Sequence, residues 1–149
     1  MTNALAGEQA IELNKEVTRR AFEALNTGDV AVYDEILAPD FVDHFPQPGQ
    51  PPGPEGFKQA VVGFRSLFPD INCSLDDVIA EGDKVMFRTT CTGTQAAPMP
   101  GLPPSDRLIT MNGILVFRIV DGKIVERWGV SDLMGALLLP LQAAAAASS

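Results

Sequence analysis

The chain has 149 residues, which suits a single domain, and a formal net charge of −8 at pH 7. This acidic surplus repels phosphate groups and anionic lipid, and therefore argues against nucleic acid or a membrane surface as a partner. A hydrophobic fraction of 46% and a charged fraction of 20% are typical of a folded globular protein. We expect one domain over residues 1–149, with its core over residues 8–142 and a flexible tail at 143–149.

Cysteine and histidine are scarce: the chain has Cys73, Cys91 and a single histidine, His44. The cysteines lack the spacing of zinc or redox motifs, so we expect reduced thiols in a cytoplasmic protein. One histidine excludes metal sites with two or three imidazole ligands, and no glycine-rich phosphate loop is present. We predict no metal and no cofactor. Residues 133–149 carry no charge but are too short and too interrupted to span a membrane, and we interpret residues 133–141 as a docking segment.

The first half of the chain predicts three helices. Apolar residues at helical spacing indicate a helix over residues 8–26, and a shorter one is expected over residues 30–37, stopped by Pro39. An extended piece at 41–45 and a proline-rich loop follow. The third helix is predicted over residues 54–68, where its apolar stripe consists of Phe57, Val61, Phe64 and Phe68.

The second half changes to strand character. Apolar and β-branched residues between turn signals predict four strands, over residues 72–80, 84–94, 108–120 and 123–132. Glycine-containing tight turns at 81–83 and 121–123 and a proline-rich connection at 98–104 separate these strands. Helices followed by an antiparallel meander predict an α+β fold in which the sheet curls over the helices. Such a cone has a closed end that forms the core and an open end that forms a pocket.

Asp132 is the leading candidate for chemistry. Strict alternation along the last strand places it on the same face as Trp128 and Val130, against apolar neighbours. Burial there would raise the pKa of the carboxyl toward the range that a general base needs. The alternative is structural, because an aspartate at this position can cap the segment that begins at Leu133.

Three further polar residues are candidates for a pocket. His44 ends the extended piece and could relay a proton near neutral pH, or it could bridge loop and sheet. Arg88 lies in the middle of a strand and points either inward, toward a substrate oxygen, or outward. Asn112 offers a neutral donor with the same ambiguity. A serine–histidine triad would have to use His44, but no Gly-x-Ser-x-Gly elbow accompanies it.

Short motifs recur in order along residues 10–142: Phe41-x-x-His44, Phe68-Pro69-Asp70, Gly82-Asp83-Lys84-Val85, Arg88, Gly93-Thr94, Gly101-x-Pro103-Pro104 and Asp121-Gly122-Lys123-Ile124-Val125-Glu126-x-Trp128-x-x-x-Asp132. This set resembles the SnoaL-like polyketide cyclase family, within the ketosteroid isomerase/NTF2-like superfamily. The resemblance implies an NTF2-like cone and a homodimer packed through the outer face of the sheet. It also implies cofactor-free chemistry, in which an aspartate removes a carbon-bound proton and an intramolecular aldol step closes a ring.

The resemblance also assigns residues. Asp132 matches the catalytic aspartate at the end of the last strand, and His44 is the second catalytic candidate, as a pocket residue. Gln95 departs from the pattern, because members often carry histidine after Gly-Thr. The candidate substrate-binding residues are Trp128, Arg88, Asn112, Phe41, Phe64 and Met99.

We therefore expect a cyclase or isomerase that acts on a hydrophobic carbonyl or polyketide-like small molecule. A homodimer is also indicated by the strand at 84–94, both faces of which carry apolar or small residues. The alternatives are a non-catalytic ligand-binding module, a scaffold whose cone is filled, and a limonene-type epoxide hydrolase. The hydrolase needs an Asp-Arg-Asp set, of which Asp132 and Arg88 supply two members. A ketosteroid isomerase ranks lower, because Tyr33, the only tyrosine, lies on the second helix.

Overall fold

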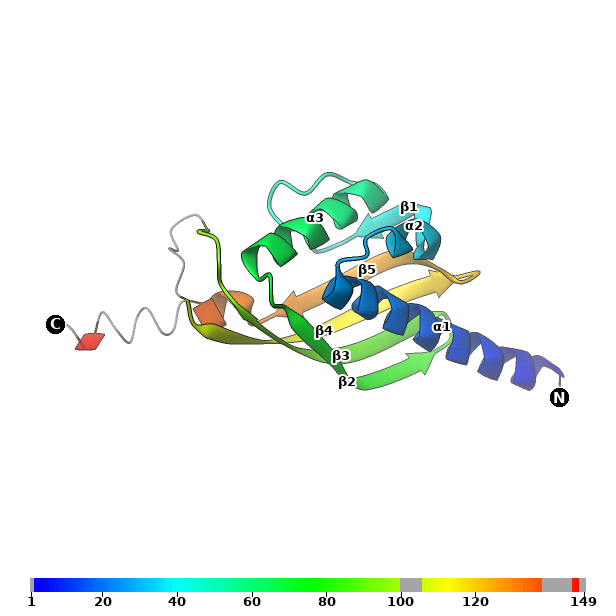
Figure 1. The fold of residues 1–149 in the computed structure, drawn as a ribbon. Helices are drawn as coiled ribbons and strands as arrows, with labels where there is room; N and C mark the ends of the chain where they lie inside the picture. The colour runs from blue at the N-terminus through cyan, green and yellow to red at the C-terminus, as the bar shows by residue number, and fades with distance from the viewer. Residues whose placement is uncertain (1, 100–105, 138–145, 148–149) are drawn as a thin grey trace.

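The computed structural model describes residues 2–99, 106–137 and 146–147. Helices cover the concave face of one curved sheet (Figure 1), which confirms the predicted α+β cone. No helix in these ranges is long and apolar enough to cross a bilayer. The elements in chain order are α1 (Thr2–Thr27), α2 (Val32–Ile36), β1 (Leu37–Asp43), α3 (Gly53–Leu67), β2 (Asn72–Glu81), β3 (Lys84–Thr94), β4 (Leu108–Val120) and β5 (Lys123–Ser131).

α1 packs on the sheet through the small and branched residues of its predicted stripe, and Val17, Ala21 and Ala24 are buried. Leu13, expected on the same stripe, is 52% exposed. Gly28 ends the helix with a φ of 82°, a conformation that glycine adopts without steric cost. The Arg65 guanidinium of α3 then donates to the carbonyl oxygens of Leu25 and Asn26 at 2.7 and 2.8 Å, and so ties the end of α1 to α3.

α3 begins one residue before the proline that predicted it and lies above the sheet, along the cavity described below. Val61 and Phe68 of its stripe are buried, while Phe57 and Phe64 are half-buried. Gly56 sits directly against the preceding loop, because a Cβ atom at this position would lie 1.6 Å from the carbonyl oxygen of Pro51. The first turn of α3 therefore depends on a glycine for close approach.

The sheet has the strand order β1-β5-β4-β3-β2 and is mixed. The hairpins that join β2 to β3 and β4 to β5 are antiparallel as predicted, but β1 pairs parallel to β5. A purely antiparallel sheet was therefore a wrong expectation. The meander argument holds for β2 to β5, which follow one another along the chain, whereas β1 is separated from them by α3 and adds to the free edge of β5.

A β-bulge in β5 changes which side chains face the cavity. In the pairing of β4 with β5, Arg118 lies opposite Glu126 whereas Ile119 lies opposite Ile124, so Val125 is an extra residue. The alternation of faces is therefore out of phase on the two sides of the bulge. Ile124 is buried in the core, but after the bulge it is the odd-numbered residues that face inward.

The structure joins Cys73 and Cys91 in a disulfide, which overturns the expectation of reduced thiols. The two residues are direct partners in the pairing of β2 with β3, and their Cα atoms are 4.0 Å apart. Their separation of 18 residues carries no motif. It is the hairpin register, invisible in a count of cysteines, that brings the two side chains together on the inner face.

The expected docking segment at 133–141 is helical over residues 133–137, and its remainder lies outside the described residues. Most of the tail at 143–149 and the Gly101-x-Pro103-Pro104 motif also lie outside the described residues. Of the two glycine turns, Gly82 and Gly122 both adopt positive φ, at 60° and 74°, as the hairpins require.

Candidate functional site

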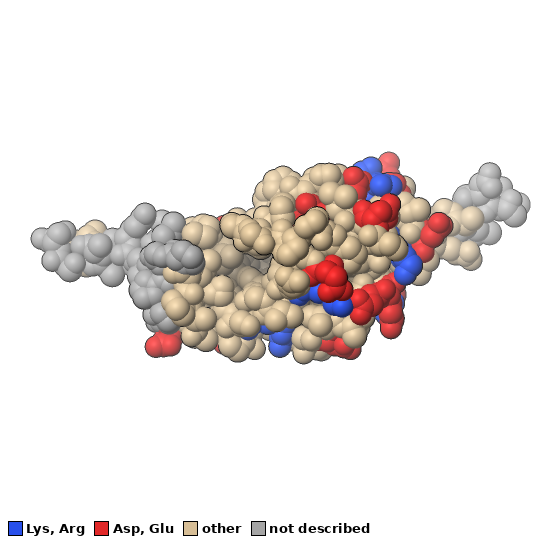
Figure 2. Space-filling view, turned by 90° about the horizontal axis from the view of Figure 1, so that it is seen from above, with Lys and Arg blue, Asp and Glu red and all other residues tan. Residues whose placement is uncertain are grey.

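The cone contains a cavity of about 560 Å³ between the helices and the inner face of the sheet. Its walls are mainly apolar, and the side chains that form them include Phe22, Leu25, Phe57, Phe64, Leu67, Met99, Met111, Leu115 and Phe117. Seen from the helix side (Figure 2), charged residues gather toward the end at which α1 begins, and the opposite half has few. A cavity of this size excludes the filled cone that the scaffold alternative requires.

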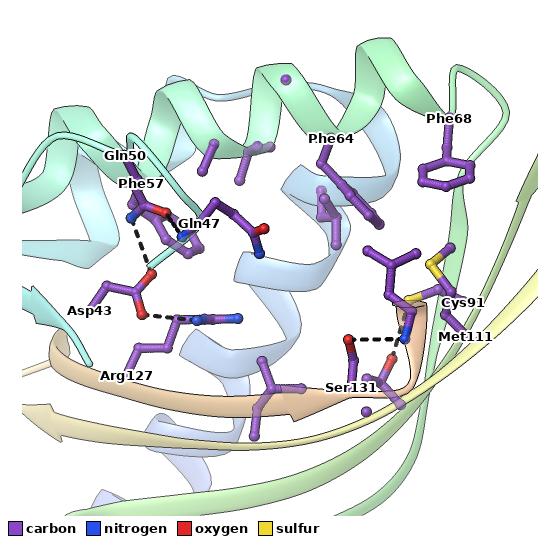
Figure 3. Close-up of a pocket in the computed structure, with 18 of the residues that line it drawn as sticks. Asp43, Gln47, Gln50, Phe57, Phe64, Phe68, Cys91, Met111, Arg127 and Ser131 are labelled. Carbon is purple, nitrogen blue, oxygen red and sulfur yellow. Dashed lines mark hydrogen bonds and ion pairs between the residues drawn. The ribbon is translucent and has the colours of Figure 1, made fainter. Parts of the chain in front are cut away.

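A buried ion pair forms one polar end of the cavity (Figure 3). Asp43 and Arg127 are partners in the parallel pairing of β1 with β5, and both side chains face inward. Nη1 of Arg127 lies 2.9 Å from Oδ1 of Asp43, and the two side chains are only 18% and 7% exposed. The guanidinium also lies over the Phe57 ring, 5.8 Å from its centroid, which adds a cation–π contact.

Two glutamines from the loop between β1 and α3 complete this end. Nε2 of Gln50 donates to Oδ2 of Asp43 at 3.2 Å, and Oε1 of Gln50 accepts from the backbone N–H of Gln47 at 2.9 Å. The backbone N–H of Phe45 donates to Oδ1 of Asp43 at 3.0 Å. The Asp43 carboxylate is thus held by three donors, while the side chain of Gln47 lines the cavity (Figure 3).

The other end of the cavity is formed by neutral groups on β3, β4 and β5. Thr89, Asn112 and Ser131 line it, together with Cys91 of the disulfide. Figure 3 shows Ser131 and Cys91 on this side, away from Asp43 and Arg127. The cavity therefore offers an ionic group at one end and weak, neutral donors at the other.

Asp132 lies beside this neutral end but does not line the cavity. Its carboxylate accepts from the backbone N–H of Asn112 at 2.6 Å and from Nδ2 of Asn112 at 3.0 Å. These hydrogen bonds, that from the side chain first, lower the pKa of Asp132 below its ordinary value, contrary to the predicted rise. Asp132 also stands at the N-cap position of the helical turn that begins at Leu133, since its main-chain oxygen accepts from the N–H of Ala136 at 2.9 Å, but its carboxylate is bonded to Asn112.

His44 lies outside the cavity, on the outer side of the sheet. Its ring stacks on Trp128 with centroids 4.7 Å apart and planes at 7°, and Nε2 lies 3.1 Å from Oε1 of Glu126. Glu126 also accepts from Arg118 at short range, and the hydrogen bonds from Arg118 and then His44 lower the pKa of Glu126. The structure therefore does not bring His44 together with Asp132, and the bulge at Val125 turns Trp128 outward.

The remaining candidates divide into two groups. Asn112, Phe64 and Met99 line the cavity, whereas Phe41 and Arg88 do not. Phe41 is buried behind the wall, with its ring centroid 5.5 Å from that of Phe57. Arg88 points outward, where Nε lies 2.8 Å from Asp77 and Nη1 lies 3.3 Å from Asp76. Arg88, the arginine of the Asp-Arg-Asp set that an epoxide hydrolase would need inside the cavity, thus lies on the opposite face of the sheet.

Sequence reasoning missed the ionic end altogether. Asp43 stood within the Phe41-x-x-His44 motif, and Arg127 directly precedes Trp128, but strict alternation assigned Arg127 to the outer face. Only Gly129 gave a local signal: a Cβ atom there would lie 3.2 Å from Nη2 of Arg127. A glycine two residues after an arginine leaves space for an inward guanidinium.

Comparison with known families accords with this fold and cavity. The model of the SnoaL-like polyketide cyclases matches residues 15–138, and the chain belongs to this family. It is 32% identical over 117 residues to the nogalonic acid methyl ester cyclase of Streptomyces nogalater, covering 76% of this chain and 87% of that protein. The aklanonic acid methyl ester cyclase of Streptomyces peucetius is also 32% identical, over 80% of this chain and 85% of its own length.

Solved structures have the same architecture. TsrD from Streptomyces laurentii superposes with a TM-score of 0.75 at 32% identity, covering 83% of this chain and 91% of TsrD. IdmH from Streptomyces antibioticus gives a TM-score of 0.75 at 31% identity, covering 87% and 98%. The predicted NTF2-like fold and family membership are therefore confirmed.

Proposed function

We propose that this protein is a cofactor-free cyclase that closes a ring in a hydrophobic, polyketide-like carbonyl compound by an intramolecular aldol step. The single observation that carries the proposal is the apolar cavity of about 560 Å³ with an ionic group at one end. Such a cavity can hold a folded chain with its reacting carbons close together and with little water present. The names of the two curated relatives, methyl ester cyclases of nogalonic and aklanonic acid, support the same class of substrate.

For the proton transfer we propose Asp132 as the base. Its neighbours Ser131 and Leu133 line the cavity, as does Asn112, which holds the carboxylate. A carboxylate has about four lone-pair sites, and Asn112 occupies two of them, so acceptor capacity remains. The lowered pKa keeps Asp132 ionised at neutral pH. His44 enters the proposal as a positioning residue, because its main-chain N–H donates to the main-chain oxygen of Arg127 at 2.9 Å and its ring stacks on Trp128, which together fix the end of β1 on β5.

We also propose that two copies associate through the outer face of the sheet. Ile79 and Val130 are 67% and 61% exposed there, with Met86 and Ile114 between them; these four residues are the outer apolar face. Ile79 pairs with Met86 in one row of the sheet and Ile114 with Val130 in the next, so the patch crosses four strands beside Arg88, which pairs with Ile114. Exposed apolar patches of this kind mark interaction sites.

A cytoplasmic location is part of the proposal, and there the Cys73–Cys91 disulfide would meet a reducing environment.

The test is conversion of aklanonic acid methyl ester, followed by liquid chromatography and mass spectrometry. Ring closure by an aldol step conserves mass, so the product should elute differently at unchanged mass. Asp132→Asn should lower turnover by about 10²–10⁴-fold. Asp40→Asn, an exposed carboxylate on β1, is the matched control and should leave turnover unchanged.

Two results would contradict the proposal at different levels. Normal turnover in Asp132→Asn with loss of turnover in Asp43→Asn would move the base to the ionic end of the cavity. No change in elution for a panel of polyketide diketones that bind in the cavity would instead favour the non-catalytic ligand-binding module.

A further inference from the structure

We propose that Arg127, held by Asp43 and assisted by Gln47, is an oxygen-binding subsite for a β-dicarbonyl group in its enol or enolate form. The inference rests on the proposed function, because it names the part of the substrate that this end of the cavity binds. It assigns a role to a guanidinium that neither the sequence motifs nor the proposed base explains.

The first argument is the unused hydrogen-bonding capacity of Arg127. A guanidinium has five N–H donors, and Nη1 uses its two on Oδ1 of Asp43 at 2.9 Å and the carbonyl oxygen of Phe45 at 3.5 Å. Within the described residues, Nε and Nη2 have no acceptor. Donors left unpaired in a largely buried position cost free energy unless water or a ligand satisfies them. The three N–H donors of Nε and Nη2 at the cavity wall are therefore available to an oxygen atom of a ligand.

The second argument is that the guanidinium is already fixed before any ligand binds. Its backbone is in register with Asp43, the Phe57 ring lies against one side, and Gly129 leaves space for Nη2. Asp43 is in turn held by Gln50 and by the N–H of Phe45. A donor group that need not reorganise stabilises developing negative charge more strongly than a mobile one.

The third argument concerns the kind of oxygen. A planar guanidinium matches two oxygens at once, which favours a β-dicarbonyl over a lone ketone. Because Asp43 already neutralises the charge of Arg127, and the protein carries a net charge of −8, the site does not suit a phosphate dianion. The apolar walls suit a flat carbon skeleton beside the oxygens. These properties together describe the enolised donor carbon of an aldol reaction.

Gln47 supplies the second contact. Its side-chain amide lines the cavity at the same end (Figure 3), and among the described residues it has no hydrogen-bonding partner of its own. An amide can donate a further hydrogen bond to one of the two oxygens that the guanidinium binds. Because Gln47 is otherwise exposed, its substitution should change binding without disturbing the fold.

The experiment measures the binding of three small probes by titration calorimetry, without requiring turnover. Benzoylacetone carries the β-dicarbonyl, benzylacetone has the same carbon skeleton with one ketone, and 3-phenylpropionate carries a carboxylate. We expect benzoylacetone to bind at least about 10-fold more tightly than benzylacetone, since hydrogen bonds to charged groups are the stronger ones. Tighter binding of 3-phenylpropionate than of benzoylacetone would overturn the assignment to a dicarbonyl.

Arg127→Gln alone would leave Asp43 buried and unpaired and could unfold the protein, so the main variant is the double substitution Asp43→Asn/Arg127→Gln. It should weaken benzoylacetone binding about 10- to 100-fold and leave benzylacetone unaffected. Gln47→Ala should weaken benzoylacetone about 2- to 10-fold. The matched control is Glu16→Gln/Arg19→Gln, which removes an ion pair from the exposed face of α1.

Unchanged benzoylacetone binding in the folded double variant would overturn the subsite. The outcome is separate from that of the proposed function. A protein that binds benzoylacetone through Arg127 but closes no ring would refute the cyclase activity and support the subsite. If the double variant closes rings at the parental rate and binds benzoylacetone with the parental protein's affinity, the cyclase activity would be supported and the subsite refuted.

Discussion

Tyr33 lines the cavity, yet its hydroxyl already has a partner. The phenol is buried and donates to the main-chain oxygen of Ala21 at 2.8 Å, and its ring meets Phe57 edge-on at 5.2 Å. Burial raises the pKa of Tyr33 far above its ordinary value, so the group stays neutral. Because the phenol donates its hydrogen bond to a carbonyl oxygen of α1, Tyr33 links α2 to α1. It is therefore not the oxyanion donor that a ketosteroid isomerase would need.

Tyr33→Phe should therefore affect stability and not chemistry. Loss of one buried hydrogen bond should lower the free energy of unfolding by about 1 kcal/mol. Turnover and benzoylacetone binding should stay close to the parental values. Chemical denaturation measures the first and the cyclase assay the second. A large fall in turnover with unchanged stability would give the phenol a catalytic role.

At the scale of the elements, the sequence predicts α3 and the strands that follow it well, but it starts the first helix at residue 8 instead of Thr2, the first strand at residue 41 instead of Leu37, and assigns the faces of β5 wrongly. The four predicted strands end within one residue of those observed, because turn glycines and prolines mark their ends. The face of β5 depends on one extra residue, Val125, which has no compositional signature in the chain. Because of that bulge, Trp128 lies on the outer face of the sheet and Arg127 on the inner face, the reverse of what strict alternation predicts. The parallel edge strand and the disulfide were missed for the same reason, since register is a property of pairs of strands.

The first turn of α3 provides a test of packing at this scale. Gly56→Ala would place a methyl group on the carbonyl oxygen of Pro51, so we expect a loss of about 3 kcal/mol of stability, at the upper end for overpacking. Gly63→Ala in the same helix meets no atom within 4 Å and should stabilise the protein by up to about 1 kcal/mol. Thermal melts of the two variants should move in opposite directions. An unchanged melting temperature in Gly56→Ala would mean that the loop before α3 can move away from the helix.

For the whole molecule, the outer apolar face is the feature that a single copy leaves unexplained. No helix covers this side of the sheet within the described residues (Figure 1), although the side carries Ile79, Met86, Ile114 and Val130. A stable interface requires about 800 Å² from each partner, a demand that a patch across four strands can meet when its polar rim is included.

We predict that Ile114→Glu/Val130→Glu converts a dimer to a monomer, because charges at the centre of an apolar interface are strongly unfavourable. Multi-angle light scattering at micromolar concentration measures the mass directly. Leu13→Glu, on the exposed side of α1, is the control and should remain dimeric. A monomeric parent protein, or a dimeric double variant, would exclude this face as the interface.

The position of β5 between β1 and β4 has a consequence for the order of folding. The Asp43–Arg127 pair joins residues 84 positions apart, and β5, which connects β1 to the rest of the sheet, is the last strand that the chain makes. Until residues 123–131 leave the ribosome, β1 has no partner and β4 keeps an open edge that other chains can pair with. The cavity therefore cannot exist on a nascent chain. Its closure is a late, long-range event, so we expect this protein to fold slowly for its size and to need protection from aggregation during synthesis.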